Sequence, residues 1–163
     1  NMAWEYDGHP FSNVNTRPWM GPKFWCPDMQ GTSDGNNYKV FRYADAILMA
    51  AECLNELDRD EEALVYLNKT RNRAGIGDYT YRTHIRLQDE IRNERSRELF
   101  GEFQRKYDLV RWGTFYQVLS ESTDYQARTD NLKPCHEYYP IPDKEVVYSK
   151  YALDNKAYNA CGL

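Results

Sequence analysis

The sequence predicts a mainly α-helical protein, in which a tetratricopeptide-like helical hairpin packs on a long helix and extensive irregular loops form much of the remainder. Three observations lead to this fold class. Two consecutive segments, 42–57 and 60–74, each carry apolar residues at helical spacing. A third segment, which starts near residue 87, repeats that spacing with charged residues on its other faces. Residues 1–40 instead contain many prolines and glycines, which interrupt helices and strands.

The first helix of the predicted hairpin has one face that is nearly all apolar. That face consists of Ala44, Ile47, Leu48, Ala51, Leu54 and Asn55. Asp60 is positioned to cap the second helix, which runs to about Ala74, and Gly75 supplies the left-handed residue that ends it. The length of the pair and its small facing residues are typical of a tetratricopeptide repeat. One such hairpin cannot bury both of its faces, so it needs neighbouring helices.

The segment 91–113 is predicted to lie within a single long helix that begins near Leu87 and continues to about Leu119. Its apolar face consists of Leu87, Ile91, Leu99, Phe103, Tyr107 and Val110. Arg95 falls within this apolar stripe, and a partly buried arginine needs a carboxylate partner. Opposite charges also recur three or four positions apart, where they can pair on a helix. We therefore expect a structural ion-pair lattice that consists of Glu94, Arg95, Glu98, Arg105, Asp108 and Arg111.

The same carboxylates allow a second interpretation, a glycoside hydrolase that uses Glu94 together with Glu98 or Glu102. Residues four apart on a helix lie within reach of each other. However, an acid catalyst needs a raised pKa, and the intervening arginines favour ion pairing instead. We therefore expect no enzymatic activity and no catalytic residue.

Composition and charge exclude several classes of partner. A net charge of −4 and a pI of about 5.4 argue against nucleic acid held by phosphate contacts. The longest uninterrupted apolar run, Ala46–Ala51, is far shorter than the roughly 20 residues that span a bilayer. No signal peptide begins the chain, which opens in a loop-like segment, so we expect an upstream part to be absent.

The cysteines and histidines do not form a metal-binding pattern. The histidines lie far apart in the sequence and no two cysteines have CxxC spacing, so we expect no metal and no cofactor. Cys53 falls within a helical pattern, which predicts a small core residue. Cys26, Cys135 and Cys161 lie in loop-like segments, where one disulfide can form in an oxidising compartment. Their pairing stays open.

The remaining segments are predicted to be mostly irregular. Residues 76–85 form a connector, and residues 121–134 are polar and loop-like. Residues 138–142 are extended, because a residue before proline avoids the helical region. Residues 143–148 form one short helical turn, and the tail from Ser149 is irregular.

Trp4, Trp19 and Trp25 all fall in the first, loop-rich segment. Two interpretations of these tryptophans are open. They can anchor long loops onto the helical body, or they can be exposed platforms that stack on a ligand. Under the second interpretation they are the candidate ligand-binding residues.

Four blocks of the sequence, taken together and in order, resemble the SusD/RagB family. They are Phe41–Glu52 (FRYADAILMAAE), Leu67–Gly75 (LNKTRNRAG), Asn93–Gly113 with its ending YDLVRWG, and Tyr139–Pro142 (YPIP) followed by Glu145. Two departures stand out. Asp58 replaces the glycine that is usual between the hairpin helices, and the tail at 149–158 matches the family's ending poorly. Aspartate tolerates the left-handed conformation that such a loop requires.

The resemblance implies a fold, a location and partners. It implies a C-terminal helical domain at 41–163, and the loop-rich segment at 1–40 belongs to that same domain. Members of the family are non-catalytic surface lipoproteins of the outer membrane. They bind an oligosaccharide, polysaccharide or other nutrient and work with a TonB-dependent (SusC-like) transporter. The membrane would be reached only through an N-terminal lipid anchor. The alternative is a tetratricopeptide-like protein-interaction module without glycan affinity.

Overall fold

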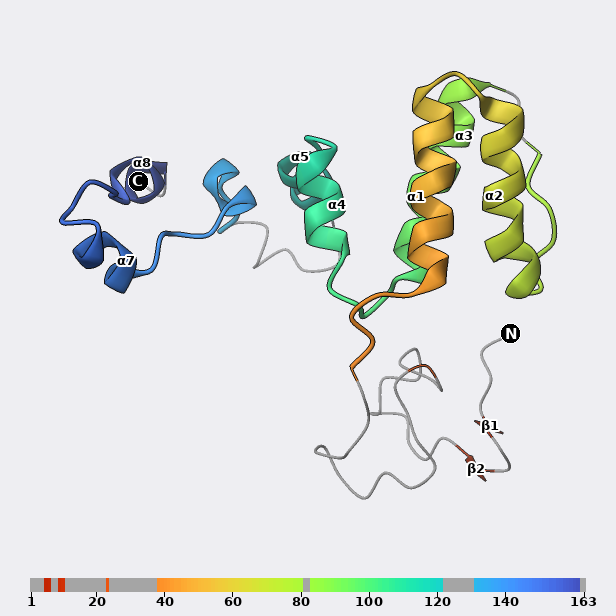
Figure 1. Ribbon diagram of the computed structural model, residues 1–163, viewed down its shortest axis with the longest axis horizontal. Coiled ribbons are helices and arrows are strands. Elements are labelled where there is room, and N and C mark those ends of the chain that lie inside the picture. Colours follow the sequence, from red (N-terminus) through yellow and green to blue (C-terminus); the bar gives the residue numbers. More distant parts are fainter. Residues whose placement is uncertain are drawn as a thin grey trace. The chain divides into compact units, whose positions relative to one another are not determined.

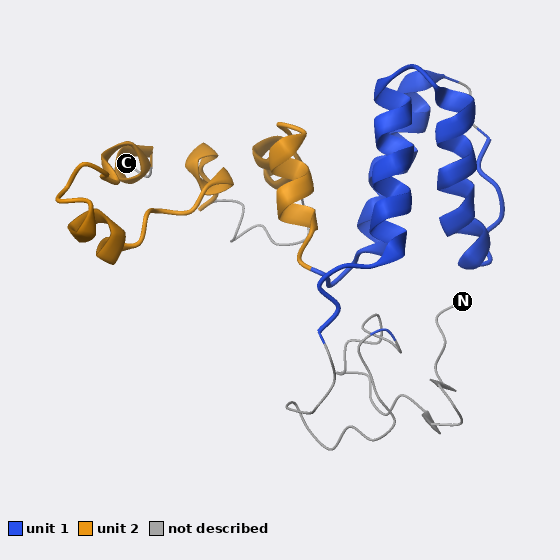
Figure 2. Ribbon diagram, viewed as in Figure 1, with its two compact units in different colours: residues 1–102 blue, residues 103–163 orange. Residues whose placement is uncertain are grey.

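The computed structural model describes residues 5–6, 9–10, 23, 38–80, 83–121 and 131–161 (Figure 1). Most of these residues are helical, as the sequence predicts. The chain divides into two compact units, residues 1–102 and residues 103–163 (Figure 2). Two short strands in the first unit, β1 (Glu5–Tyr6) and β2 (His9–Pro10), pair antiparallel.

The first unit contains the predicted hairpin, with α1 (Tyr43–Glu56) and α2 (Asp60–Arg73) side by side and α3 (His84–Glu98) packed on both (Figure 1). The bounds of α1 and α2 lie within a residue or two of the predicted ones, which confirms the hairpin. Asp58 adopts a φ of 58° between the helices, and Gly75 adopts 72° after α2. Both residue types tolerate this left-handed conformation, which ends a right-handed helix.

Six fully buried apolar side chains form the core of this unit. They are Leu48 and Ala51 of α1, Ala63 and Leu67 of α2, and Leu87 and Ile91 of α3. The alanines allow the hairpin helices to approach closely. Each of the larger side chains contributes about 1.5–3 kcal/mol through burial.

Asp60 has a different role from the predicted cap. Arg59 occupies the N-cap position of α2, and no side chain caps this helix there. The Oδ1 atom of Asp60 instead accepts a hydrogen bond from Asn55 Nδ2 at 2.8 Å and lies 2.9 Å from His84 Nδ1. Asp60 therefore connects the end of α1 and the start of α3 to the start of α2.

The prediction of one long helix from Leu87 to Leu119 is wrong. α3 ends at Glu98, and the next helix, α4, spans Arg105–Arg111. Between them, Gly101 has a φ of 77° and Phe103 a φ of 60°. Two left-handed residues so close together cannot continue a right-handed helix. The apolar spacing continues across this break, which is why the pattern resembles a single helix.

The second unit consists of short helices. They are α4, α5 (Phe115–Ser120), the 3-10 helix η2 (Pro134–Glu137), α7 (Asp143–Tyr148) and α8 (Lys156–Cys161). The helical turn predicted at 143–148 is confirmed. The prediction of an irregular tail is wrong at α8, where a disulfide between Cys135 and Cys161 joins this helix to η2.

The cysteine predictions have two outcomes. One disulfide is present, as expected, and it pairs Cys135 with Cys161 at a Cα–Cα distance of 5.9 Å. Cys53, in contrast, is a free and exposed thiol, so its predicted place in the core is wrong. It lies two positions after the buried Ala51, which puts it on nearly the opposite side of α1.

A matched pair of leucine substitutions tests the assignment of the core. Leu67 is 0% exposed and Leu57 is 65% exposed. We expect Leu67→Ala to lower the free energy of unfolding by about 2–5 kcal/mol because it leaves a cavity between the three helices. Leu57→Ala should change it by less than about 0.5 kcal/mol. Urea denaturation followed by circular dichroism measures both, and equal effects would contradict this core.

Candidate functional site

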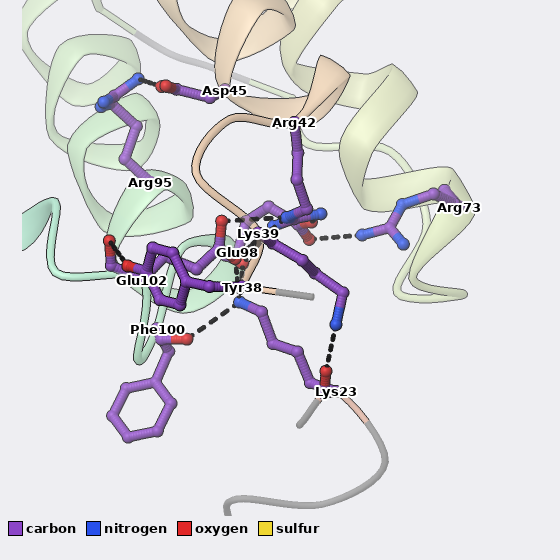
Figure 3. Close-up of polar contacts among 10 residues, drawn as sticks. All are labelled: Lys23, Tyr38, Lys39, Arg42, Asp45, Arg73, Arg95, Glu98, Phe100 and Glu102. Carbon is purple, nitrogen blue, oxygen red and sulfur yellow. Dashed lines mark hydrogen bonds and ion pairs between the residues drawn. The ribbon is translucent and has the colours of Figure 1, made fainter. Parts of the chain in front are cut away.

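The ends of α1 and α3 meet in a network of charged side chains that centres on Arg42 (Figure 3). Arg42 is the N-cap residue of α1, Glu98 is the last residue of α3, and Glu102 lies in the turn that follows. The guanidinium donates to Glu98 Oε1 at 2.8 Å and to Glu102 Oε1 at 2.7 Å, and its Nε atom lies 3.0 Å from both oxygens of Glu102. One arginine therefore holds two carboxylates in fixed positions.

Lys23 joins the network from a distant part of the sequence. Its ammonium group pairs with Glu102 and donates to the backbone carbonyls of Glu98 at 2.8 Å and Phe100 at 2.9 Å. The last carbonyls of a helix have no partner within the helix, so the lysine satisfies groups that the end of α3 leaves open. Lys39 in turn donates to the carbonyl of Lys23 at 2.6 Å.

The carboxylate of Glu102 is held in its charged form. Burial works to raise the pKa of Glu102, but the hydrogen bonds from Arg42 and Lys23 outweigh it, so that the pKa lies below its ordinary value. The hydrogen bond to Glu102 likewise raises the pKa of Arg42. Glu102 and Arg42 therefore both stay ionised at neutral pH.

A second group of ion pairs joins α2 to α3. Arg71 Nη1 lies 2.7 Å from Glu90 Oε1 and 3.7 Å from Glu94 Oε2. Arg97 Nη2 lies 2.7 Å from Glu94 Oε2 and also contacts Glu90. Glu94 is almost fully buried, so both arginines compensate a charge that is removed from water.

Arg95 connects α3 to α1 inside the protein. Its Nη1 atom donates to Asp45 Oδ1 at 2.9 Å, and both residues are buried (Figure 3). Asp45, a partner of this arginine, thus lies on another helix, which charge spacing along α3 alone does not indicate. Glu98 accepts from Arg42 and from Arg73.

The second unit holds the other three residues of the predicted lattice. Asp108 is buried and accepts from Arg111 Nε at 3.0 Å and from Nη2 at 2.9 Å. The guanidinium of Arg105 lies 5.7 Å from the centre of the Trp112 ring. Burial lowers the pKa of Arg105, and Asp108 opposes this effect.

An open cavity of about 540 Å³ lies beside the Arg42 network in the first unit. Seven of the described residues line it: Lys23, Lys39, Arg42, Arg73, Arg97, Glu98 and Phe100. Its volume falls within the range of small-ligand sites, roughly 300–1,000 Å³. We call this feature the basic cavity, and it is the candidate functional site of the described residues.

The arrangement opposes the glycoside hydrolase interpretation. Glu94, Glu98 and Glu102 each face at least one arginine within ion-pair distance. The lowered pKa of Glu102 is the reverse of what a general acid requires. Among the residues that the structure describes, no three histidine, cysteine or acidic side chains are arranged to hold a metal ion.

The predicted site residues and the observed site overlap only in part. Trp4, Trp19 and Trp25 lie outside the described residues. Sequence reasoning did not single out the cations that complete the network, which are Lys23, Lys39, Arg42, Arg71, Arg73 and Arg97. The available signal was that Arg42, Arg71, Arg73 and Arg97 fall within motif blocks. The sequence pattern does not indicate which carboxylate each of them meets.

Comparison with known proteins decides the family. The sequence profile of the SusD family matches residues 7–158. The chain belongs to the SusD family. It is 36% identical over 155 residues to SusD-like protein P25 of Formosa agariphila, which covers 87% of this chain and 28% of that protein. It is 34% identical over 139 residues to SusD-like protein P2 of the same organism, with 77% of this chain and 26% of that protein covered.

A solved structure supports the same assignment at the level of the fold. The crystal structure of a SusD superfamily protein from Bacteroides vulgatus superposes on this chain with a TM-score of 0.61 and 32% sequence identity. The match covers 68% of this chain and 25% of that one. The chain thus spans about a quarter of the length of the relatives that it matches.

Replacing Glu102 with glutamine tests the Arg42 network through its dependence on pH. The pKa of Glu102 lies below its ordinary value of 4.5, so the stability that it contributes is present above that pH and is lost as the pH falls through the lowered pKa. We expect Glu102→Gln to lower the free energy of unfolding by about 1–3 kcal/mol near neutral pH, because the partly buried Lys23 and Arg42 each lose a charge-assisted hydrogen bond. The loss of stability below about pH 4.5 should also become less steep.

The control for this test is Asp89→Asn, which removes an exposed carboxylate from α3. Urea denaturation at a series of pH values measures both variants. An acid dependence of Glu102→Gln that equals that of the unmodified protein would show that this carboxylate does not carry the effect.

Proposed function

We propose that the protein to which this chain belongs is a non-catalytic, surface-exposed binding protein for glycans in a polysaccharide uptake system. Membership of the SusD family carries this proposal, because the profile match extends over nearly the whole chain. The charged network supports it, since its carboxylates are paired with arginines and are not poised for proton transfer.

In this proposal the ion-pair lattice is structural. Buried pairs such as Arg95–Asp45 fix one helix against another, because sliding the helices would leave a charge without a partner. A helical body that is held in this way can present loops at a constant spacing. The loop-rich segment at 1–40 would supply ligand-facing aromatic rings, with Trp4, Trp19 and Trp25 as candidates.

The proposed partner in uptake is a TonB-dependent, SusC-like transporter of the outer membrane. The hairpin offers a surface for a protein partner, since Met49, Leu57 and Val65 are exposed apolar residues on it. The same surface supports the alternative function, a tetratricopeptide-like interaction module without glycan affinity.

The proposed location is the cell surface, with attachment through an N-terminal lipid anchor. The disulfide Cys135–Cys161 supports a location in an oxidising compartment, where such bonds persist. In the part of the chain that the structure describes, every helix is too short or too polar to cross a membrane.

Differential alkylation tests the proposed compartment. Protein isolated from its native cells without a reducing agent should react with a thiol reagent at Cys53, which is exposed and free. Cys135 and Cys161 should react only after reduction. Peptide mass spectrometry reports each site separately, and Cys53 serves as the internal control. Direct labelling of Cys135 in protein from intact cells would contradict an oxidising compartment.

Affinity electrophoresis tests glycan binding. The full-length protein is run through native gels cast with single polysaccharides, and we expect selective retardation by one class of them. A non-binding globular protein in each gel controls for the viscosity of the matrix. Uniform mobility in all gels, together with co-purification of a transporter, would favour the interaction module instead.

A further inference from the structure

The basic cavity brings cationic side chains together. Of the seven lining residues that the structure describes, five are cationic and one, Glu98, is acidic. The chain as a whole has a net charge of −4, so this concentration of cations is a local feature of the described residues.

Two of these cations retain donors that face solvent. Arg73 bonds Glu98 through Nη2 alone, and its side chain is 62% exposed. Arg97 bonds Glu90 and Glu94 through Nε and Nη2, and its side chain is 50% exposed. Within the described residues, Nη1 of each arginine thus remains available to a ligand that enters the cavity. A guanidinium edge suits the planar or trigonal oxygens of a carboxylate or a sulfate.

The placement of these arginines is set by the rest of the network. Arg73 ends α2, and Arg97 lies one residue before the end of α3. Glu98, which is partly buried, orients Arg73, and the buried Glu94 orients Arg97. Figure 3 shows Arg73 directed toward Glu98, beside the guanidinium of Arg42. An anion that binds here gains several cations without having to order them first, which favours affinity.

We propose that the basic cavity binds an acidic sugar residue through its carboxylate or sulfate ester, with Arg73 and Arg97 as the direct ligands. This inference rests on the proposed glycan-binding function and narrows its substrate class to anionic glycans. The volume of about 540 Å³ allows a sugar ring to accompany the charged group.

Titration calorimetry on the full-length protein tests the proposal with three probes. They are an oligogalacturonate for the carboxylate, a sulfated galactan oligosaccharide for the sulfate, and a neutral oligoglucan. We expect one acidic probe to bind and its affinity to fall as sodium chloride is raised from about 0.05 M to about 0.3 M, because salt screens the exposed cations. Arg73→Gln and Arg97→Gln should each weaken that probe about tenfold, as expected for loss of one charge-assisted hydrogen bond.

Arg59→Gln is the matched control. Arg59 is a half-exposed arginine that pairs with Glu62 and lies outside the cavity, so its replacement makes the same change in net charge. The variants Arg73→Lys and Arg97→Lys keep the charge but lose the guanidinium fork, and they should recover only part of the affinity. Thermal unfolding of each variant confirms that it is folded, which the exposure of both side chains favours.

Three outcomes would overturn the proposal. If an acidic probe binds but Arg73→Gln and Arg97→Gln behave like Arg59→Gln, the basic cavity is not the site, although glycan binding stands. If only the neutral probe binds, the anionic class is wrong and the proposed function still stands. If polysaccharides of every class fail to bind, both the proposal and the glycan-binding function fail.

Discussion

The arrangement of the first unit depends on the ion pairs that the guanidinium of Arg42 makes. This arginine begins α1 and bridges Glu98 and Glu102, which lie at and just after the end of α3. Lys23 completes the arrangement by covering the carbonyls at that end. Burying a carboxylate without such partners costs free energy. The positions of Arg42 and Lys23 therefore determine where the chain must place Glu102 after α3. The turn with its left-handed Gly101 and Phe103 brings Glu102 to that position.

The apolar core and the ion pairs have different roles in this unit. Six buried apolar residues bring three helices together, but apolar contacts are non-directional and set the relative positions of the helices only loosely. The pairs Arg95–Asp45 and Arg71–Glu90 each join two helices at one position along their length. We infer that the charges select one arrangement from those that the core would allow, in keeping with the known role of buried polar groups in specificity.

The pairing of these carboxylates with cations also has a consequence for function. Catalysis by carboxylates requires one of them to hold a proton near neutral pH, whereas Glu102 is held ionised. A binding protein has no such requirement. It requires a rigid surface with hydrogen-bond donors that remain available after the ion pairs within the fold have formed. Arg73 and Arg97 meet this requirement. The network therefore stabilises the fold and also orients the groups that we propose for recognition.

The sequence by itself determined the helical hairpin, the residues Asp58 and Gly75 that end its two helices, the short helix α7 and the family. These features follow from local periodicity, turn residues and motif order. The sequence also indicated that Arg95 needs a carboxylate. Only the tertiary structure decided that this partner is Asp45, that the long helix breaks after Glu98, and that five cations converge on one cavity. These features join residues that are distant in sequence, and a pattern of charges along one chain carries no information on which of them meet in space.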